Sequence, residues 1–408
     1  MHDYLFNVEV VRFAFVLGIL FSMLQYERRH LTTGSIVVPG YIAVASLQPL
    51  VIAATLVNAF LSFWLVNKVL PRWVLLYGRT KFSVLVVLSI GIQFALLRLS
   101  PSTGYLWESD IPLFVGVGYV IPALIAHDMA RQGIRRTMGS VARAAAWVAV
   151  PLWIATLVLP ELTLSGSPVG FGRAAILAPS WIPAAVMLSA AAAWGLLHNR
   201  GLRASGFVGA AYLGMFAADW GQIALLVAVA IITWALVTRI LMRVMILFGR
   251  RKFAAMLIVG ALLSWASLLT IGPWLGWDPS HYLSLSALAL TPLFVPGLMA
   301  NDMERASVGV TLGGTFLSAL FAIPAALAAQ LLAEGGTWWQ AGLLLAVSLG
   351  AGAWVFWPQI VRGGHLLAGR VGALGRWLGL VRPPAAHRPD PPAPGAHRAR
   401  PATAVAGQ

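Results

Sequence analysis

The sequence predicts an all-α polytopic membrane protein, and three observations support this fold class. Of the 408 residues, 59% are hydrophobic and only 10% are charged, whereas soluble domains contain about 25% charged residues. Long apolar runs recur along the chain and are separated by short basic clusters. Two sequence motifs also appear twice, in the same order. The composition therefore excludes an ordinary soluble enzyme and indicates a chain embedded in a bilayer.

About thirteen apolar segments, bounded by charged residues or by Gly and Pro, are candidate helices. They lie at residues 5–25, 34–47, 49–67, 82–97, 112–126, 141–160, 174–197, 204–219, 221–238, 253–271, 284–300, 308–333 and 338–358. Residues 1–165 and 174–335 are expected to form two tandem six-segment membrane units. An extra transmembrane helix follows at 338–358, and residues 359–408 are expected to be a disordered, Pro- and Arg-rich tail.

The basic residues determine the expected orientation. The net charge is +15, and on a soluble chain this excess would indicate nucleic acid as a partner. Here the basic residues lie between apolar segments, so the positive-inside rule explains them and no nucleic-acid partner is expected. If every segment crosses, all basic residues except Arg12, Arg98 and Arg173 fall on one face. This asymmetry predicts a multi-pass membrane protein with its N-terminus outside and its tail in the cytoplasm.

Motifs for cofactors and catalysis are missing from the sequence. The chain has no cysteine, which excludes disulfides and thiolate metal sites. Its eight histidines lack metal-ligand spacing, and neither a P-loop nor a G-x-S-x-G elbow occurs. We therefore expect no metal and no cofactor in this chain, and the sequence identifies no catalytic residue.

An internal duplication is the strongest signal in the sequence. YGRTKF at 77–82 returns as FGRRKF at 248–253, with an offset of 171 residues. PALIAHDMAR at 122–131 returns as PGLMANDMER at 296–305, with an offset of 174 residues. Two ordered matches at nearly one offset predict two related units in one chain.

A weaker similarity lies inside each unit. VVPGYIA at 37–43 resembles VIPALIA at 120–126 and FVPGLMA at 294–300. These segments belong to three-segment halves, and an odd number of crossings turns the second half upside down. Inverted halves with short Gly- or Pro-broken segments are typical of many transport proteins.

The segment at 34–47 is too short for an ordinary crossing. As a helix it would be about 21 Å long, against a hydrocarbon core of roughly 30 Å. It is either re-entrant or a broken helix, because Pro39 removes a backbone donor and Gly40 permits unusual conformations. Freed backbone groups could line a cavity, or the break could be a kink that lets helices pack closely, and both alternatives stay open. The broken-helix motifs comprise Pro39, Gly40, Tyr41, Pro122, Pro296, Gly297, Asn301 and Asp302.

Basic residues near segment ends are the candidates for binding an acidic substrate or partner. Guanidinium groups bind carboxylates through paired hydrogen bonds. The alternative is that these residues anchor the topology in the headgroup layer. The candidates are Arg28, Arg29, Arg79, Lys81, Arg250, Arg251, Lys252 and Arg305. The nearby acids are expected to form local ion pairs with their basic neighbours; these acids are Glu27, Asp128, Asp302 and Glu304.

Three ordered motifs resemble a known family. ERRHLTTGSIVVPGY, the YGRTKF or FGRRKF element and VPGLMANDMER are similar to the membrane subunit of poly-γ-glutamate synthase, the PgsC/CapC family. Family members are about one unit long, so this chain resembles a tandem fusion of two. It departs from the family pattern at His30, where the family usually has Gly, and at Ala123, which replaces the Gly of PGL. The second unit has GAAY at 209–212 where VPGY would align.

The resemblance implies an integral, multi-pass subunit in the bacterial inner (plasma) membrane, part of a complex that synthesises and exports poly-γ-glutamate, a capsule-type polymer. The implied partners are a cytoplasmic Mur-ligase-like subunit of the PgsB/CapB type, a PgsA/CapA-type subunit and the anionic polyglutamate itself. ATP and a divalent metal are implied on the ligase. The chain itself would be a non-catalytic or co-catalytic subunit of this ATP-dependent amide ligase.

Two other classes remain as alternatives. A stand-alone secondary transporter of small solutes would suit the inverted halves, although no charge at mid-membrane depth is available to couple an ion. An integral membrane transferase would need a cluster of carboxylates at the cytoplasmic face, and the acids there are few and lie beside arginines.

Overall fold

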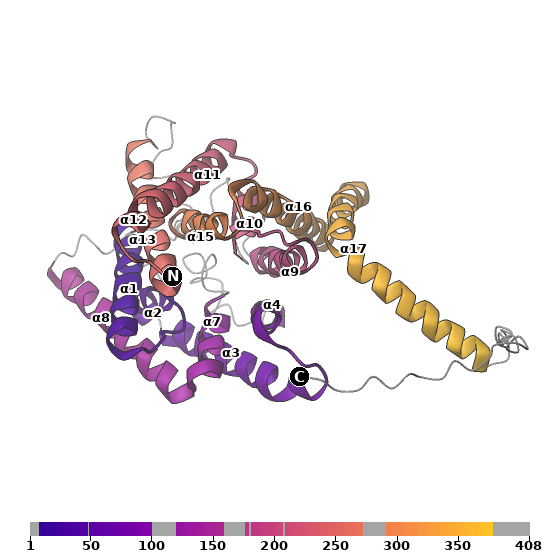
Figure 1. Ribbon diagram of the computed structural model, residues 1–408, viewed down its shortest axis with the longest axis horizontal. Helices are drawn as coiled ribbons and strands as arrows, with labels where there is room; N and C mark the ends of the chain where they lie inside the picture. Colours follow the sequence, from indigo (N-terminus) through magenta and orange to yellow (C-terminus); the bar gives the residue numbers. More distant parts are fainter. Residues whose placement is uncertain are drawn as a thin grey trace, which may run out of the picture. The chain divides into compact units, whose positions relative to one another are not determined.

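The computed structural model describes an all-helical protein, which confirms the predicted class (Figure 1). The residues it describes are 8–47, 49–99, 120–158, 176–178, 181–206, 209–271 and 291–377. The chain divides into a unit from Met1 to Trp357 and a second unit from Pro358 to Gln408. All contacts discussed below lie within the first unit.

Each of the thirteen predicted apolar segments contains a helix in its described part. The helices are α1 (Val8–Arg29), α2 (Val38–Val44), α3 (Pro49–Trp64), α4 (Gly78–Leu99), α7 (Ile121–Gln132), α8 (Ile134–Val158), α9 (Ile182–Arg200), α10 (Gly209–Met215), α11 (Trp220–Ala235), α12 (Met242–Val244), α13 (Gly249–Thr270), α15 (Thr291–Arg305), α16 (Val308–Ala333) and α17 (Trp338–Trp377). Within the described residues, eight helices are long and apolar enough to cross a membrane. The chain is therefore a multi-pass membrane protein.

Details of the first half of the chain return in the second half. The seven-residue helix α2 corresponds to the seven-residue helix α10. A π-helical turn follows both α3 and α11, at Leu65–Val69 and Leu236–Leu241. Gly78 and Gly249, the glycines of the two GRxKF motifs, have nearly equal positive φ angles of 54° and 55°. Only glycine adopts this conformation at little cost, which explains why both copies of the motif contain it.

The four segments with Pro or Gly breaks form short helices. α2 and α10 have 7 residues, α7 has 12 and α15 has 15. A helix of seven residues rises only about 10 Å, a third of a hydrocarbon core. The predicted shortness of segment 34–47 is thus confirmed. Its helix begins only at Val38, and Pro39 occupies the first turn, where its missing N–H costs nothing.

The loop that precedes α2 bends sharply out of α1. His30 has a φ of 53°, in the left-handed region that favours glycine at helix C-terminal ends. At the corresponding place after α9 stands Gly201, with a φ of 67°. The histidine that departs from the family pattern therefore keeps the glycine backbone conformation of the other half.

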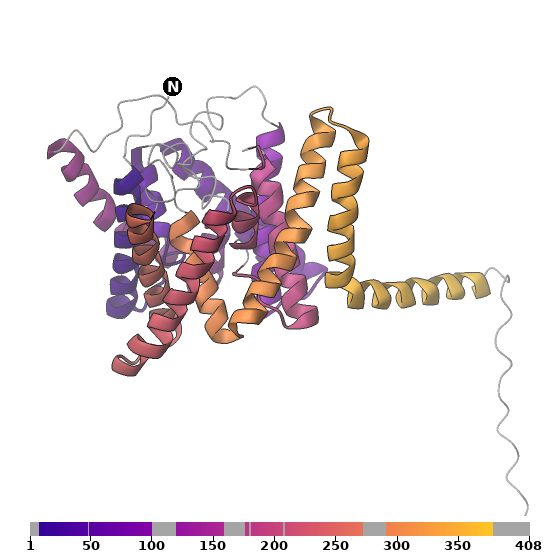
Figure 2. The same ribbon diagram turned by 90° about the horizontal axis from the view of Figure 1, so that it is seen from above.

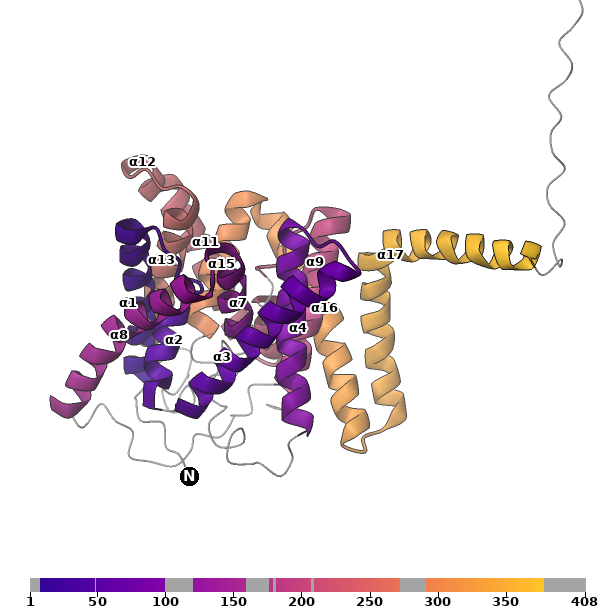
Figure 3. The ribbon, with the colours of Figure 1, turned by 90° about the horizontal axis from the view of Figure 1, so that it is seen from below.

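Several helix ends meet at one end of the bundle, which we call the basic face. It comprises the ends of α1, α7, α9 and α15 and the beginnings of α4, α8 and α13. Four contacts bring these ends together: Gln25 Nε2 to Ser140 O (3.1 Å), Thr32 N to Gln132 Oε1 (3.0 Å), the rings of Phe82 and His127 (4.9 Å between centroids) and Arg203 to Asp302 (3.2 Å). In Figure 3, α12 and the beginning of α4 lie at this same end. The gathering of basic segment ends that the sequence predicts is therefore present in the structure.

The first broken segment carries the chain from the basic face to the opposite end. A five-residue connection from Trp73 to Tyr77 joins the helical turns after α3 to α4, so α3 also runs toward the basic face. Since α1 ends at that face too, residues 30–47 must return the chain between them. They do so as a non-helical stretch followed by α2.

Two glycine contacts hold the short Pro-Gly helices against long helices. A Cβ added to Gly18 of α1 would lie 2.5 Å from the backbone nitrogen of Gly40 in α2. A Cβ added to Gly260 of α13 would lie 2.9 Å from the backbone nitrogen of Gly297 in α15. Both pairs of helices cross with backbones in direct contact, the packing that small residues allow in membranes.

The C-terminal helix is longer than predicted. α17 was expected to end near residue 358 but continues through Pro358 to Trp377. The segment after Pro358 carries Leu367, Val371 and Leu374 at helical spacing, a period that the composition-based expectation of disorder overlooked. Residues 378–408 of the predicted tail lie outside the described residues. In Figure 2, the first part of α17 runs beside α16, and Ser348 Oγ donates to Phe321 O at 2.8 Å.

Replacing Gly18 with alanine should weaken the crossing of α1 and α2. The added methyl would push against backbone, so we expect the free energy of unfolding to fall by about 1–3 kcal/mol. The matched control is Gly313→Ala in α16, where an added Cβ meets nothing within 4 Å. The thermal midpoint of the purified protein, followed by tryptophan fluorescence, measures both. An unchanged midpoint for Gly18→Ala would contradict the crossing.

Candidate functional site

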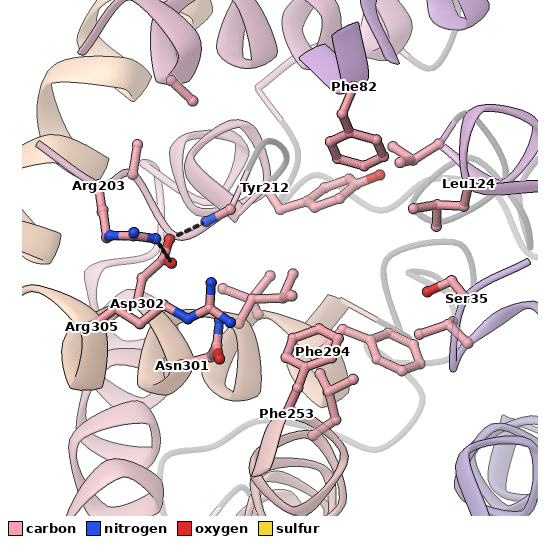
Figure 4. Close-up of a pocket in the computed structure, with 18 of the residues that line it drawn as sticks. Ser35, Phe82, Leu124, Arg203, Tyr212, Phe253, Phe294, Asn301, Asp302 and Arg305 are labelled. Atoms are coloured by element: carbon pink, nitrogen blue, oxygen red, sulfur yellow. Dashed lines mark hydrogen bonds and ion pairs between the residues drawn. The ribbon is translucent and has the colours of Figure 1, made fainter. Parts of the chain in front are cut away.

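A cavity of about 430 Å³ lies among the short helices (Figure 4). All four broken segments contribute to its wall. The lining residues from these segments are Ser35 and Val37 before α2, Val120 and Leu124 at α7, Gly206 and Tyr212 at α10, and Phe294, Val295, Leu298, Asn301, Asp302 and Arg305 on α15. The volume falls within the range of small-molecule sites, roughly 300–1,000 Å³. The convergence of the broken segments therefore creates a ligand-sized space.

Both copies of the GRxKF motif also reach this cavity. Phe82 ends the first copy and Phe253 ends the second, and both rings line the wall. Phe82 in addition packs edge-on against His127 of α7, with 4.9 Å between ring centroids. The repeated phenylalanine thus has a structural reason: it connects the basic end of each long helix to the cavity.

Charged and polar groups gather at one end of the cavity. The Arg203 guanidinium lies 3.2 Å from Asp302 Oδ1, and the backbone N–H of Gly206 donates to Asp302 Oδ2 at 2.8 Å. Asn301 is 8% exposed, and its Oδ1 has no hydrogen-bond partner among the described residues. Arg305 lines the same end and has no ion-pair partner in the described part of the chain. The Arg203–Asp302 pair is internally neutral, so Arg305 supplies the remaining charge.

The Pro-Gly residues themselves pack rather than line this cavity. Pro39 and Gly40 are buried at the α1 crossing, and Pro296 and Gly297 are buried at the α13 crossing. Tyr41 is 2% exposed, and its hydroxyl lies 3.3 Å from Thr55 Oγ1. Pro122 is also buried, at the start of α7. Of the two roles considered, these residues have the close-packing role, and their neighbours in the sequence form the cavity wall.

The second basic motif is paired with acids throughout. Arg250 approaches Asp128 of α7 at 3.9 Å and lies over the ring of Tyr26. Arg251 forms a two-pronged pair with Glu27 of α1. Lys252 donates to Glu304 of α15 at 2.6 Å. These three pairs tie the start of α13 to three other helices, and two of them join the two halves of the chain.

The expectation of local ion pairs is wrong for these acids. Each carboxylate is paired with a residue far away in sequence rather than with its basic neighbour. Asp128 is 3% exposed and Asp302 is 7% exposed, so they are buried rather than solvated. The reason is tertiary. α7 and α15 direct their ends toward the beginning of α13 and the loop after α9, where partly buried guanidinium groups supply the counter-charges that the buried carboxylates need.

The first basic motif lacks these partners. Lys81 forms no ion pair within the described residues. Its counterpart Lys252 is held by Glu304, but the position that corresponds to Glu304 in the first half is Ala130. The side chain of Arg79 is outside the described part of the structure. The first motif therefore keeps, at the basic face, a lysine that no acid in the described part of the chain neutralises.

Other predicted binding residues are exposed at the basic face. Arg28 and Arg29 end α1 as exposed side chains, and Arg305 ends α15. Among the described residues, no group of three His, Asp or Glu side chains could hold a metal ion. The arrangement offers positive charge to an anionic ligand or partner and offers no described metal centre.

Sequence reasoning missed several residues of the cavity. In the sequence, Arg203 is one of many basic residues between apolar segments and Tyr212 is the end of GAAY, and neither pattern predicts a place in a cavity wall. Phe82 and Phe253 were visible in the sequence, because phenylalanine ends both copies of the basic motif, but no function was attached to them. The partnership of Arg203 with Asp302 has no signal in sequence spacing, since 99 residues separate the two.

The fold and the site together define a polytopic helical membrane protein with a cationic end and a cavity among broken helices. A family model described as "Capsule biosynthesis CapC" matches residues 17–138 and 175–312. The chain belongs to this capsule biosynthesis CapC family. Its two matched segments agree with the duplicated motifs and with the recurring order of helices.

Two bacterial relatives support the assignment. The "PGA biosynthesis protein CapC" of Bacillus subtilis (strain 168) is 32% identical over 127 residues, which make up 31% of this chain and 83% of the relative. The "Capsule biosynthesis protein CapC" of Bacillus anthracis has the same identity over the same length and coverage. No solved structure matches the chain.

Exchanging the charges of Lys252 and Glu304 tests the pairing of the second motif. Lys252→Glu places two carboxylates together, so the free energy of unfolding should fall, whereas Lys252→Glu with Glu304→Lys should recover most of the loss. We expect a coupling of about 0.5–3 kcal/mol, the range for residues in contact. The thermal midpoints of the parent, the two single variants and the double variant form a double-mutant cycle that measures this coupling. Purely additive losses would show that the two side chains do not interact.

Proposed function

We propose that this protein is the membrane subunit of a poly-γ-glutamate synthesis and export complex. Family membership carries the proposal, because both bacterial relatives are named for the biosynthesis of PGA or of a capsule. In this proposal the chain is a non-catalytic or co-catalytic subunit. The amide bond is formed on a cytoplasmic Mur-ligase-like partner, which holds ATP and a divalent metal, and a PgsA/CapA-type subunit completes the complex.

The chain is, in this proposal, a tandem fusion of two family-length units. The two family segments, the repeated π-helical turns and the repeated positive-φ glycines support this reading. Each unit contains two three-helix halves of opposite direction. The segment from residue 30 to residue 47 supports the inversion, because it returns the chain across the bundle between α1 and α3.

The basic face is the cytoplasmic face in this proposal. Positive charge is retained on the cytoplasmic side of membrane proteins, and both the ligase and the newly made polyanion would be there. The exposed Arg28 and Arg29, together with Lys81, which no described acid pairs with, offer the guanidinium and ammonium groups that carboxylates bind. The ion-paired second motif, in contrast, serves the structure of the membrane subunit.

Single cysteines test the orientation directly, because the chain contains none. Glu334→Cys lies in the exposed turn between α16 and α17, and Arg29→Cys lies at the exposed end of α1. A membrane-impermeant thiol reagent should label the first in intact cells and the second only after permeabilisation. The reverse pattern would show that the basic face is external.

The two lysines provide a matched test of function. Lys81→Gln removes a charge that no described acid neutralises, so polymer production should fall several-fold while the thermal midpoint is unchanged. Lys252→Gln leaves Glu304 unpaired, so the midpoint should fall, and adding Glu304→Gln should restore both the midpoint and polymer production. The measurement is γ-linked glutamate polymer made by cells that also express the native ligase partner, with membrane levels determined in parallel.

Two results would contradict these assignments. If the Lys81→Gln variant makes as much polymer as the parent, Lys81 of the first motif does not take part in binding the substrate or the partner. If the parent chain and its native ligase make no polymer at all, the synthase assignment fails, and a stand-alone transporter of small solutes becomes the better explanation.

A further inference from the structure

The cavity changes character along a single helix face. Phe294, Leu298, Asn301 and Arg305 follow one another on α15 at intervals of four, three and four residues, and all four line the cavity. Such spacing places side chains on one face of a helix. The span corresponds to about 16 Å of helix rise. The wall therefore passes from an aromatic ring to a guanidinium group over about three turns.

The inner part of the cavity is apolar on several sides. Leu257 lines it from α13, and Phe294 of α15 and Leu124 of α7 line it from two other helices (Figure 4). A glutamate polymer would bring a carboxylate with every residue into these surroundings. An unpaired charge in such an environment is very costly, and the charged lining residues described lie only at the other end. The cavity is thus unsuited to a polyanion.

The polar end provides for one anionic group. Asp302 already neutralises Arg203, whereas Arg305 has no ion-pair partner among the described residues. Asn301 adds a buried amide whose Oδ1 has no partner within the described part of the chain. An amide presents both donors and an acceptor, and a half-turn of its terminal group exchanges them. A carboxylate can accept two hydrogen bonds from a guanidinium and a third from the amide.

We propose that this cavity binds a single-chain anionic amphiphile of the fatty-acid class. The carboxylate lies at Arg305 and Asn301, and the alkyl chain lies among Leu257, Phe294 and Leu298. The head group is then at the level of the basic face and the chain points inward, as in the adjoining lipid leaflet. The ligand then has the same orientation as the lipids of that leaflet, so it can enter the cavity from the bilayer without turning over. The site goes beyond polymer synthesis and does not depend on it.

Binding of radiolabelled palmitate to the full-length protein in nanodiscs tests the proposal. Arg305→Gln should weaken binding at least tenfold, because it removes the charge and one of the paired hydrogen bonds. Asn301→Ala should weaken it several-fold. The control is Arg136→Gln, since Arg136 is an exposed residue of α8 that does not line the cavity, and it should bind like the parent.

Two further measurements separate this site from general adhesion to lipid and from a polymer path. Leu298→Trp fills the apolar wall without changing the charge, and it should abolish saturable binding in protein whose thermal midpoint shows that it is folded. Hexadecanol, which lacks the carboxylate, should compete at least tenfold less well than unlabelled palmitate. Equal palmitate binding by the parent and Arg305→Gln, equal competition by hexadecanol, or displacement by a γ-linked glutamate oligomer would overturn the proposal.

Discussion

Close packing between glycines brings helix backbones into contact in this protein, and the arrangement of the cavity depends on it. Gly18 against Gly40 and Gly260 against Gly297 bring two short helices into backbone contact with long ones. Without a side chain at these points, the short helices approach far enough for their neighbouring residues to face a common centre. In a bilayer, where apolar lipid competes with apolar side chains, such close backbone approach is a main source of helix association. The Pro-Gly pairs are therefore packing elements whose effect is to shape a cavity.

The two halves of the chain have diverged in complementary ways. The intact Pro-Gly pairs are in α2 of the first half and α15 of the second half, and both make the same glycine contact. The second basic motif is neutralised by acids from three helices, whereas the first has Ala130 where the second half has Glu304. One copy thus ties helices together, and the other keeps a lysine that no described acid pairs with.

Several features could be predicted from residues alone because they depend on local or periodic chemistry. Apolar runs predicted thirteen segments, each of which contains a helix in its described part, and the recurring motifs YGRTKF and VPGLMANDMER predicted the family, whose model matches the chain in two segments. The short helix at 38–44 followed from the Pro-Gly pair and from the length of its segment. The helix beyond Pro358 was missed because its apolar spacing is diluted by Gly and Arg.

Hydropathy, basic clusters and repeated motifs determined the class of protein. Burial in lipid requires long apolar runs, and the retention of positive charge on one side requires basic residues between them, so both leave a pattern in the sequence itself. Tertiary structure decided which charges are available. Asp128 and Glu27 neutralise the second motif only because α7 and α1 end beside the beginning of α13. It also decided that neighbours of the Pro-Gly pairs, and not the pairs themselves, line the cavity. Such contacts join residues a hundred or more positions apart, where neither spacing nor composition carries information about distance.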